Sequence, residues 1–189
     1  MVTILRLSQC GTPIGWIGYE LAASLAVKEQ IIWSLGESCI QLTGGINKQG
    51  ERSTLSLPAI IATAGVLKQQ QFTPALSNEL LFRRDQQTCL YCGNQFPREQ
   101  LSRDHIQPQA RGGRDTWTNV VTACLRCNHR KACRTPEEAN MPLLAVPYKP
   151  NRFEFMALAN RKILADQMAF LQRGFSKNMP TARQSRQRQ

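Results

Sequence analysis

The first 80 residues alternate short apolar runs with one helical pattern. In residues 18–29, leucines and alanines recur every four positions, so a helix there would have one apolar side. Apolar runs bounded by polar residues or glycine predict strands at 2–7, 31–35 and 38–42. A turn at Gly44-Gly45 is expected to end the last of them.

The next stretch is less regular. Residues 46–54 are polar and are expected to form a loop. Residues 55–67 are apolar, but Pro58 and Gly65 interrupt both a helical and a strand pattern, so their type stays open. This part of the chain contains no histidine and no catalytic constellation. We expect residues 1–80 to form a small α+β N-terminal domain, whose role its sequence does not indicate.

A second group of elements follows in residues 81–134. Apolar patterns predict strands at 101–107 and 120–123, and a helix at 125–133. Trp117, just before the second strand, is expected to anchor a core rather than to stack on a nucleic-acid base. The order of strand, strand and helix predicts a small ββα unit.

Residues 135–173 are expected to be a helical C-terminal extension. Thr135, Pro136 and Glu138 have the spacing of a capping-box helix start, and that short helix would stop before Pro142. The following residues, 142–150, are rich in proline and should be extended.

A longer helix is predicted from Asn151, a plausible cap with Glu154, to about residue 173. It has a partly apolar face, which we expect to pack on the N-terminal domain. Residues 174–189 are too polar to pack and are expected to be a basic disordered tail that tethers the chain weakly to a polyanion.

The net charge of +11 is concentrated in two segments. Residues 82–134 carry ten Lys and Arg against four Asp and Glu, and residues 173–189 carry five basic residues and no acidic ones. Each phosphate that such a surface neutralises releases a counterion, so a polyanion is the natural partner. Neither segment predicts a basic amphipathic helix with a strong apolar face, so DNA or RNA is favoured over an anionic membrane.

The chain carries no evident targeting signal. Its apolar stretches are broken by charge or glycine before they reach membrane-spanning length, and Arg6 interrupts the first of them too early for a secretory signal. We therefore expect a cytoplasmic location and no membrane partner. In that reducing compartment, cysteines spaced Cys-x-x-Cys indicate metal ligands rather than disulfides.

Four of the seven cysteines form two Cys-x-x-Cys pairs, with 31 residues between the pairs: Cys89, Cys92, Cys124 and Cys127. Two such knuckles can close tetrahedrally on one Zn²⁺, and four thiolates leave no open coordination position, so the metal would be structural. A redox motif is disfavoured because there are two pairs and neither has a thioredoxin-like context. The zinc would supply folding free energy that a small ββα unit lacks.

A second group of side chains has the chemistry needed to cut a phosphodiester. Asp104 and His105 are adjacent on a predicted strand, so their side chains tend to point apart. Asn119 follows, Asn128 opens the helix, and Lys131 lies one turn further on the same face. The knuckles tie the ends of this segment together. A general base and a metal ion on opposite sides of the phosphorus suit an in-line displacement.

These motifs resemble the HNH endonuclease family, which has a ββα-metal fold, in the subgroup with two zinc knuckles. The resemblance covers about a quarter of the chain and rests on CLYC (89–92), RDHIQPQARGG (103–113), TNVVTAC (118–124) and CLRCNHRK (124–131). The fold class that we expect is α+β, with a small α+β N-terminal domain, a zinc-stapled ββα-metal HNH module and a C-terminal helix.

The resemblance implies a role for each site residue. His105 would be the general base, and Asp104 with Asn128 would hold one divalent ion, Mg²⁺ or Mn²⁺, because their ligand atoms are hard oxygens. Asn119 would orient His105 by hydrogen bonding to the loop backbone. The residues that would contact flanking phosphates are basic and lie within or just after the second knuckle: Lys131, Arg130, Arg126 and Arg134.

The third motif position is Asn128 rather than histidine, which shifts the expected metal preference away from zinc at the catalytic site. His129 should lie about 100° around the helix, where we expect a surface or DNA-contacting residue. An alternative is that His129 is the third motif residue, if the helix starts differently.

The main hypothesis is a metal-dependent DNA endonuclease that leaves 5′-phosphate and 3′-hydroxyl ends. The alternative is a non-catalytic zinc-knuckle nucleic-acid-binding protein, which would explain the cysteines and the charge but not Asp104, His105 and Asn128. An RNA-directed nuclease is a third hypothesis, although no aromatic RNA-binding signature supports it. The oligomeric state stays open, since one ββα site cuts one strand and double-strand cutting would need a dimer or two visits.

Overall fold

A computed structural model describes residues 2–46, 48–64 and 72–177. The chain forms two compact units. The first comprises Met1–Phe72 and Arg152–Ser176, and the second comprises Thr73–Asn151 and Lys177–Gln189. Most of the expected basic tail, from residue 178 onward, lies outside the described residues. Within the described ranges, no helix is both long and apolar enough to cross a membrane.

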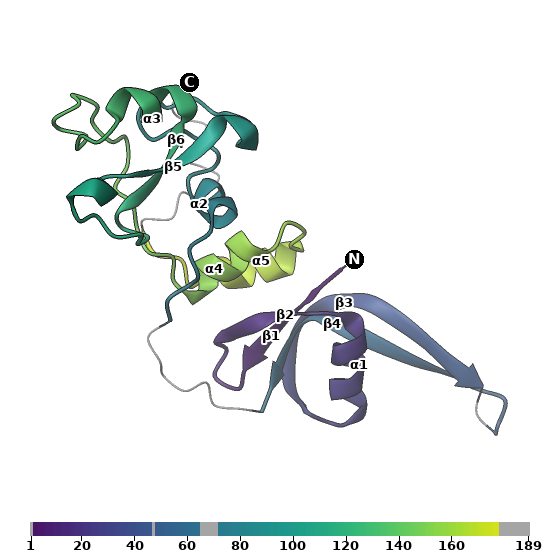
Figure 1. The fold of residues 1–189 in the computed structure, drawn as a ribbon. Coiled ribbons are helices and arrows are strands. Elements are labelled where there is room, and N and C mark those ends of the chain that lie inside the picture. The colour runs from purple at the N-terminus through teal and green to yellow at the C-terminus, as the bar shows by residue number, and fades with distance from the viewer. Residues whose placement is uncertain (1, 47, 65–71, 178–189) are drawn as a thin grey trace. The chain divides into compact units, whose positions relative to one another are not determined.

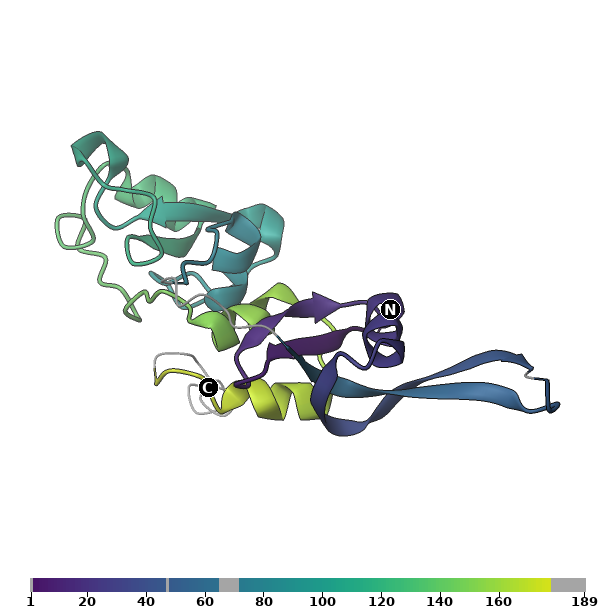
Figure 2. The same ribbon diagram turned by 90° about the horizontal axis from the view of Figure 1, so that it is seen from below.

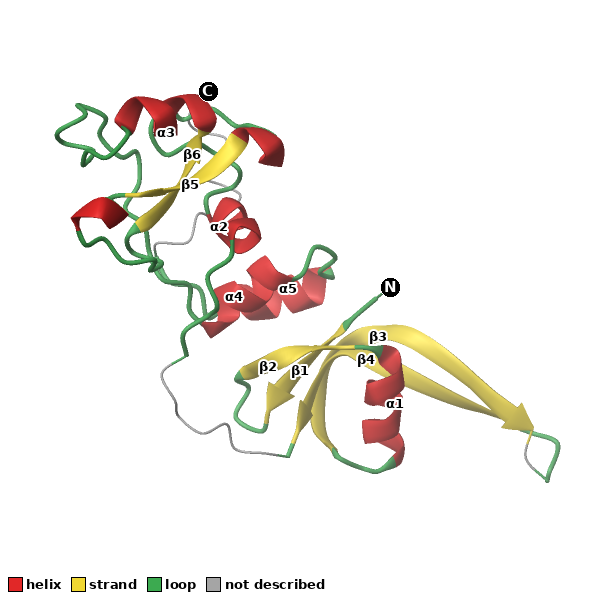
Figure 3. Ribbon diagram, viewed as in Figure 1, coloured by secondary structure: helices red, strands yellow, loops and turns green. Residues whose placement is uncertain are grey.

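The first unit is a four-stranded sheet with helices on both faces (Figures 1 and 3). Its elements in chain order are β1 (Ile4–Ser8), β2 (Pro13–Ile17), α1 (Tyr19–Val27), β3 (Ile31–Ile46), β4 (Arg52–Thr63), α4 (Arg152–Ala159) and α5 (Ala165–Gln172). The sheet order is β2-β1-β4-β3. The central strands β1 and β4 are parallel, and both outer strands pair antiparallel to their neighbours.

The two faces of the sheet bury different helices because successive strand residues point to opposite sides. Ile4, Leu57 and Ile61 pack with α1 on one face. On the other face, the sheet packs with Met156 of α4 and Leu171 of α5. The predicted packing of the C-terminal helical segment on the N-terminal sheet is therefore confirmed.

Strands β3 and β4 are longer than the sequence predicts and continue as a two-stranded ribbon beyond the sheet (Figures 1 and 2). The predicted turn at Gly44-Gly45 is wrong, because β3 runs through it and Ile46 pairs with Arg52. The predicted loop over 46–54 is correspondingly shorter. Most side chains of the ribbon are exposed, so no apolar alternation marks these residues as strands.

Proline explains two further differences between the predicted and the observed strands. Residues 55–63, whose type the sequence leaves open, belong to β4, where Pro58 lies at a register shift opposite Ser38 and before the pairing of Ile60 with β1. A residue without an N–H is tolerated at such a position. The sequence does not predict β2, because its five residues begin with Pro13 and contain a glycine.

The prediction of one continuous helix over 151–173 is wrong, because the structure has two separate helices there, α4 and α5. The break follows Asn160, whose carboxamide donates to Thr3 Oγ1 (2.8 Å) and accepts from the Lys162 backbone N–H (3.1 Å). A side chain that bonds to the backbone two residues ahead competes with helical hydrogen bonds.

The second unit is a ββα arrangement surrounded by loops and short helices (Figure 3). Its elements in chain order are α2 (Asn78–Arg84), the 3₁₀ turn Arg98–Gln100, β5 (Leu101–His105), the 3₁₀ turn Gln109–Arg111, β6 (Val120–Cys124) and α3 (Leu125–Lys131). Strands β5 and β6 pair antiparallel, and α3 follows β6 directly. The predicted order of strand, strand and helix is confirmed, and the chain has the expected α+β fold class.

The capping box predicted at Thr135 forms, but the helix does not. The Thr135 N–H donates to Glu138 Oε2 (3.0 Å), and the Glu138 N–H donates to Thr135 Oγ1 (3.3 Å). The chain completes only a turn, because Asn140 adopts a left-handed backbone with φ of 51°. That conformation is incompatible with continuing a right-handed helix.

The core of the second unit joins α2 to the strands through apolar residues: Leu81, Phe82, Leu101, Trp117 and Val120. Trp117 is 4% exposed, and its indole N–H donates to the Pro74 carbonyl (2.8 Å). Trp117 is therefore a core anchor, as predicted.

A buried charged pair, which the sequence does not predict, ties α2 to β6. The Arg84 side chain is fully buried and bonds to Asp85 in a bidentate pair (2.8 and 3.1 Å). Its other donors reach the carbonyls of Trp117 (2.7 Å), Val120 (2.9 Å) and Tyr148 (3.1 Å). Every donor thus satisfies a backbone or carboxylate acceptor, which a buried guanidinium requires.

We expect Arg84→Met to destabilise the second unit by about 3–5 kcal/mol, because it removes the cation that compensates the buried Asp85 carboxylate and the donors that three carbonyls accept from. The measurement is chemical denaturation of the full chain, with release of bound zinc to a chromogenic chelator as the reporter for this unit. The exposed Arg98→Met is the matched control and should unfold like the wild type. Equal midpoints for the two variants would contradict this account of Arg84.

Candidate functional site

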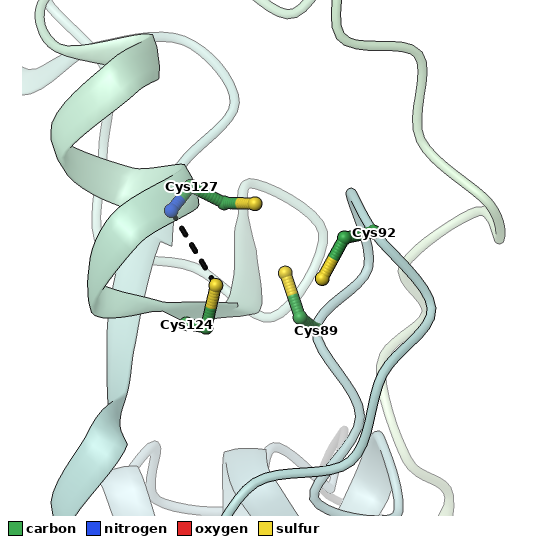
Figure 4. A group of neighbouring side chains, drawn as sticks. All are labelled: Cys89, Cys92, Cys124 and Cys127. Carbon is green, nitrogen blue, oxygen red and sulfur yellow. Dashed lines mark hydrogen bonds between the residues drawn. The ribbon is translucent and has the colours of Figure 1, made fainter.

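The four knuckle cysteines meet in one cluster. Cys89 and Cys92 lie on a turn, and Cys124 and Cys127 lie at the junction of β6 and α3 (Figure 4). All four sulfur atoms lie within 4.8 Å of one another. A tetrahedron with Zn–S bonds of 2.3 Å has edges of about 3.8 Å, so a small inward movement of the side chains would complete it.

Local backbone geometry places the cysteines. In the first knuckle, the Gly93 N–H donates to the Cys89 carbonyl (2.9 Å), and Gly93 has φ of 78°, a conformation that favours glycine. In the second knuckle, Cys124 is the N-cap residue of α3, and its sulfur accepts the Cys127 N–H (3.4 Å). Both turns aim their sulfurs at the same point (Figure 4).

The electrostatics of the cluster are compatible with a bound cation. Burial, followed by the neighbouring Cys124 and Cys89 sulfurs, raises the pKa of Cys127. Burial also acts to raise the pKa of Cys89, but hydrogen bonds from the backbone of Cys124 and Cys92 outweigh it and lower that pKa. Four thiolates cannot coexist here without a compensating charge, which a divalent ion supplies. The donor set fits a structural Zn²⁺.

A separate cavity of about 310 Å³ lies between the end of β5 and α3, and no knuckle cysteine lines it. Asp104 and His105 reach it from β5, and Asn128 and Lys131 reach it from α3. The sequence predicts that these side chains lie near one another, and the structure brings all four to this cavity. Their convergence follows from the direct step from β6 into α3.

The Asp104 carboxylate is buried and held on both oxygens. Lys131 Nζ contacts Oδ1 (3.1 Å), and the Tyr91 hydroxyl donates to Oδ2. Burial, followed by the hydrogen bond to Asp104, raises the pKa of Tyr91, so its hydroxyl remains a donor. Tyr91 lies between the first two cysteines, and nothing in the spacing identifies it as a partner of Asp104.

Lys131 has partners inside the unit. Its side chain is 1% exposed, and Nζ also donates to the His105 carbonyl (2.7 Å). Lys131 is thus held by a buried carboxylate and by the strand end, because the one-turn spacing that places it beside Asn128 also points it towards β5. Its contact with flanking phosphates stays a prediction.

The Asn128 carboxamide donates to Ser102 Oγ (2.8 Å). Within the part of the chain that the structure describes, its carboxamide oxygen has no hydrogen-bond partner. His129 is exposed and does not line the cavity. The placement of these two neighbours agrees with Asn128, rather than His129, as the third motif position.

His105 has a partner that the sequence does not indicate. Its Nε2 lies 3.0 Å from Asp115 Oδ1, and the Arg103 guanidinium binds the other oxygen of Asp115. Desolvation acts to raise the pKa of Asp115, but Arg103 and then His105 outweigh it and hold that pKa below its ordinary value. Asp115 lies in an irregular loop ten residues after His105, where no periodic pattern links the two.

Asn119 holds that loop. Its carboxamide donates to the carbonyls of Gln107 (3.1 Å) and Arg114 (2.9 Å) and accepts the Gln107 N–H (2.9 Å). Gly113 is needed in the same loop, because a Cβ there would lie 1.8 Å from the Gln107 carbonyl oxygen. Asn119 thus bonds to the loop backbone that follows His105, as expected, and does not line the cavity.

The other three basic residues expected at phosphates are exposed: Arg126, Arg130 and Arg134. Arg134 also donates to the carbonyls of Arg130 (2.6 Å) and Lys131 (3.3 Å), which end α3. Cationic side chains at a helix C-terminus are favoured by the helix dipole.

A comparison with protein-family models matches residues 89–144 to the HNH endonuclease family. The matched segment contains both knuckles, β5, β6 and α3, and it extends beyond the residues on which the resemblance rests. A search of curated proteins finds no match. The second unit therefore contains an HNH endonuclease module, and the expected family resemblance is confirmed for that module.

Proposed function

We propose that the HNH module, residues 89–144, is a metal-dependent DNA endonuclease that leaves 5′-phosphate and 3′-hydroxyl ends. The observation that carries this proposal is the shared cavity of Asp104, His105 and Asn128 beside the cysteine cluster. A general base, a carboxylate and a carboxamide oxygen around one space are the groups that hydrolysis of a phosphodiester needs.

His105 is the general base in this proposal. Its side chain is 16% exposed, so it can meet water from the cavity. An imidazole is the side chain best suited to accept or donate a proton near neutral pH. Its backbone is fixed through the carbonyl that accepts from Lys131.

Asp104 and Asn128 fit a hard divalent ion such as Mg²⁺ or Mn²⁺, because they offer oxygen ligands and leave room for water and phosphate. When bound, such an ion would polarise the phosphate and stabilise the departing 3′-oxygen. Lys131 and Tyr91 keep the Asp104 carboxylate oriented toward the cavity. Asn128 is oriented in turn by its bond to Ser102.

Exposed arginines supply the electrostatic contact with DNA in this proposal. Arg126 and Arg130 lie on α3, the helix that also presents Asn128. Contacts of this kind carry affinity without sequence selectivity and weaken as salt is raised.

The alternative function is that of a zinc-knuckle protein that binds nucleic acid without cutting it. The cysteine cluster and the arginines serve both functions equally. The paired and oriented Asp104, His105 and Asn128 serve only the endonuclease, because a binding protein has no use for a base beside metal-binding oxygens.

The test is incubation of the full chain with supercoiled plasmid, with Mg²⁺ or Mn²⁺ or with a chelator of divalent ions at a concentration that leaves the zinc in place. We expect nicking only when the divalent ion is present. The new ends should be ligatable, as 5′-phosphate and 3′-hydroxyl ends are. Binding without nicking under every divalent ion would favour the non-catalytic zinc-knuckle protein. Cutting of RNA but not of DNA would mean that the substrate is RNA.

A further inference from the structure

The His105 ring is held between the cavity and a carboxylate on the loop. Asp115 Oδ1 lies 3.0 Å from Nε2. Among the described residues, Nδ1 has no hydrogen-bond partner. A carboxylate can only accept a hydrogen bond, so in the neutral ring the proton belongs on Nε2 and the lone pair on Nδ1.

We infer that Asp115 is a positioning residue that fixes the tautomer of His105, so that Nδ1 is the atom that takes the proton from water. This inference rests on the proposed endonuclease function. As the water oxygen bonds to phosphorus, the P–O3′ bond breaks and the water proton moves to Nδ1. The ring then carries a positive charge next to the Asp115 carboxylate, and the 3′-oxygen takes a proton from solvent.

Asp115 is itself positioned by two independent contacts. Arg103, two residues before His105 on the same strand, binds Asp115 Oδ2 and also donates to Asn78 Oδ1 (2.9 Å). Asn119 binds the carbonyl of Arg114, the residue before Asp115. Because Asp115 is 44% exposed, it would be held loosely without these contacts.

Because Arg103 binds one oxygen of Asp115, the effect of the isosteric substitution Asp115→Asn on the His105 tautomer can be predicted. Arginine has donors only, so in Asp115→Asn the carboxamide oxygen should turn toward Arg103 and the NH₂ group toward His105. That NH₂ group donates to Nε2 and places the ring proton on Nδ1, where it blocks the base. Asp115→Ala removes the hydrogen bond without imposing the wrong tautomer. The isosteric variant should therefore be the more damaged of the two.

The first measurement is the position of the ring protons by ¹H–¹⁵N NMR on the full zinc-loaded chain, about two pH units above the ordinary histidine pKa of about 6.5. The chain has 2 histidines, so the exposed His129 is an internal reference. We expect the proton of His105 on Nε2 in the wild type and on Nδ1 in Asp115→Asn. A wild-type proton on Nδ1, or a tautomer unchanged in Asp115→Asn, would overturn the inference.

The second measurement is kinetic. Asp115→Asn should lower kcat by about 10²- to 10⁴-fold with little change in KM, and it should be about tenfold slower than Asp115→Ala or worse. The control Glu137→Gln removes another exposed carboxylate of the same unit and should cut normally. A merely structural role predicts the opposite order, with alanine the worse replacement. If the chain fails to cut DNA, the proposed function fails, while the NMR result still decides the tautomer.

Discussion

Replacing His105 with alanine is expected to slow nicking of supercoiled DNA by about 10²- to 10⁴-fold, the usual contribution of a general base. Alanine cannot accept the proton of the attacking water, and among the described residues no second imidazole lines the cavity beside Asp104 and Asn128. The measurement is the single-turnover rate with Mg²⁺ or Mn²⁺ in excess. Affinity for uncut DNA should change little, because the exposed arginines of α3 remain.

The control is His129→Ala, which removes the other histidine of the chain. His129 is exposed and outside the cavity, so this variant should cut at the wild-type rate. The reverse result, with His129→Ala inactive and His105→Ala active, would contradict the assignment of His105 as the general base. It would also contradict the assignment of Asn128, rather than His129, as the third motif position. Loss of DNA binding by His105→Ala would show instead that the substitution disturbs the whole unit.

Replacing Cys124 with serine is expected to remove most of the bound zinc and to unfold the strands around the site. Structural zinc sites contribute about 10–16 kcal/mol in small zinc-finger peptides, which is comparable with or larger than the whole stability of a small domain. Cys124 is 4% exposed, ends β6 and caps α3, so it joins the metal to both elements. The measurements are zinc content and amide hydrogen exchange on the full chain. Protection should fall in β5 and β6 and persist in β1 and β4.

The matched control for this variant is Cys10→Ser, an exposed cysteine of the first unit that lies outside the cluster. It should retain one Zn²⁺ per chain and wild-type exchange. Full zinc content and full protection in Cys124→Ser would mean that the four sulfurs do not form a metal site. Unfolding of both units together would mean that they are not independent in stability.

The ββα elements and the cysteine cluster could be predicted because their signals are local. The knuckles recur at a fixed spacing, and α3 starts directly after the second strand, so Asn128 is placed by counting residues from Cys127. The pairing of β5 with β6 then brings Asp104 and His105 to the same cavity. Short-range spacing was sufficient for each of these steps.

The partners of the site residues could not be predicted, because they depend on contacts across the unit. Tyr91 and Asp115 lie 13 and 10 residues from the side chains that they bind, in segments without periodic structure. Lys131 is expected from the sequence at flanking phosphates, whereas in the structure its charge is compensated by Asp104 inside the protein. The break between α4 and α5 likewise involves a distant contact, since Asn160 bonds to Thr3, 157 residues away in the chain.

The first unit is interrupted by the second in the chain, since residues 152–176 return to complete it. During synthesis, the sheet therefore emerges from the ribosome long before α4 and α5 exist. Until they arrive, the side of the sheet that carries Leu5 and Leu7 has no cover, although the whole HNH module has already been made. A chain truncated after residue 151 would contain the HNH module and a sheet with one bare apolar side, and chaperones bind such exposed apolar surfaces.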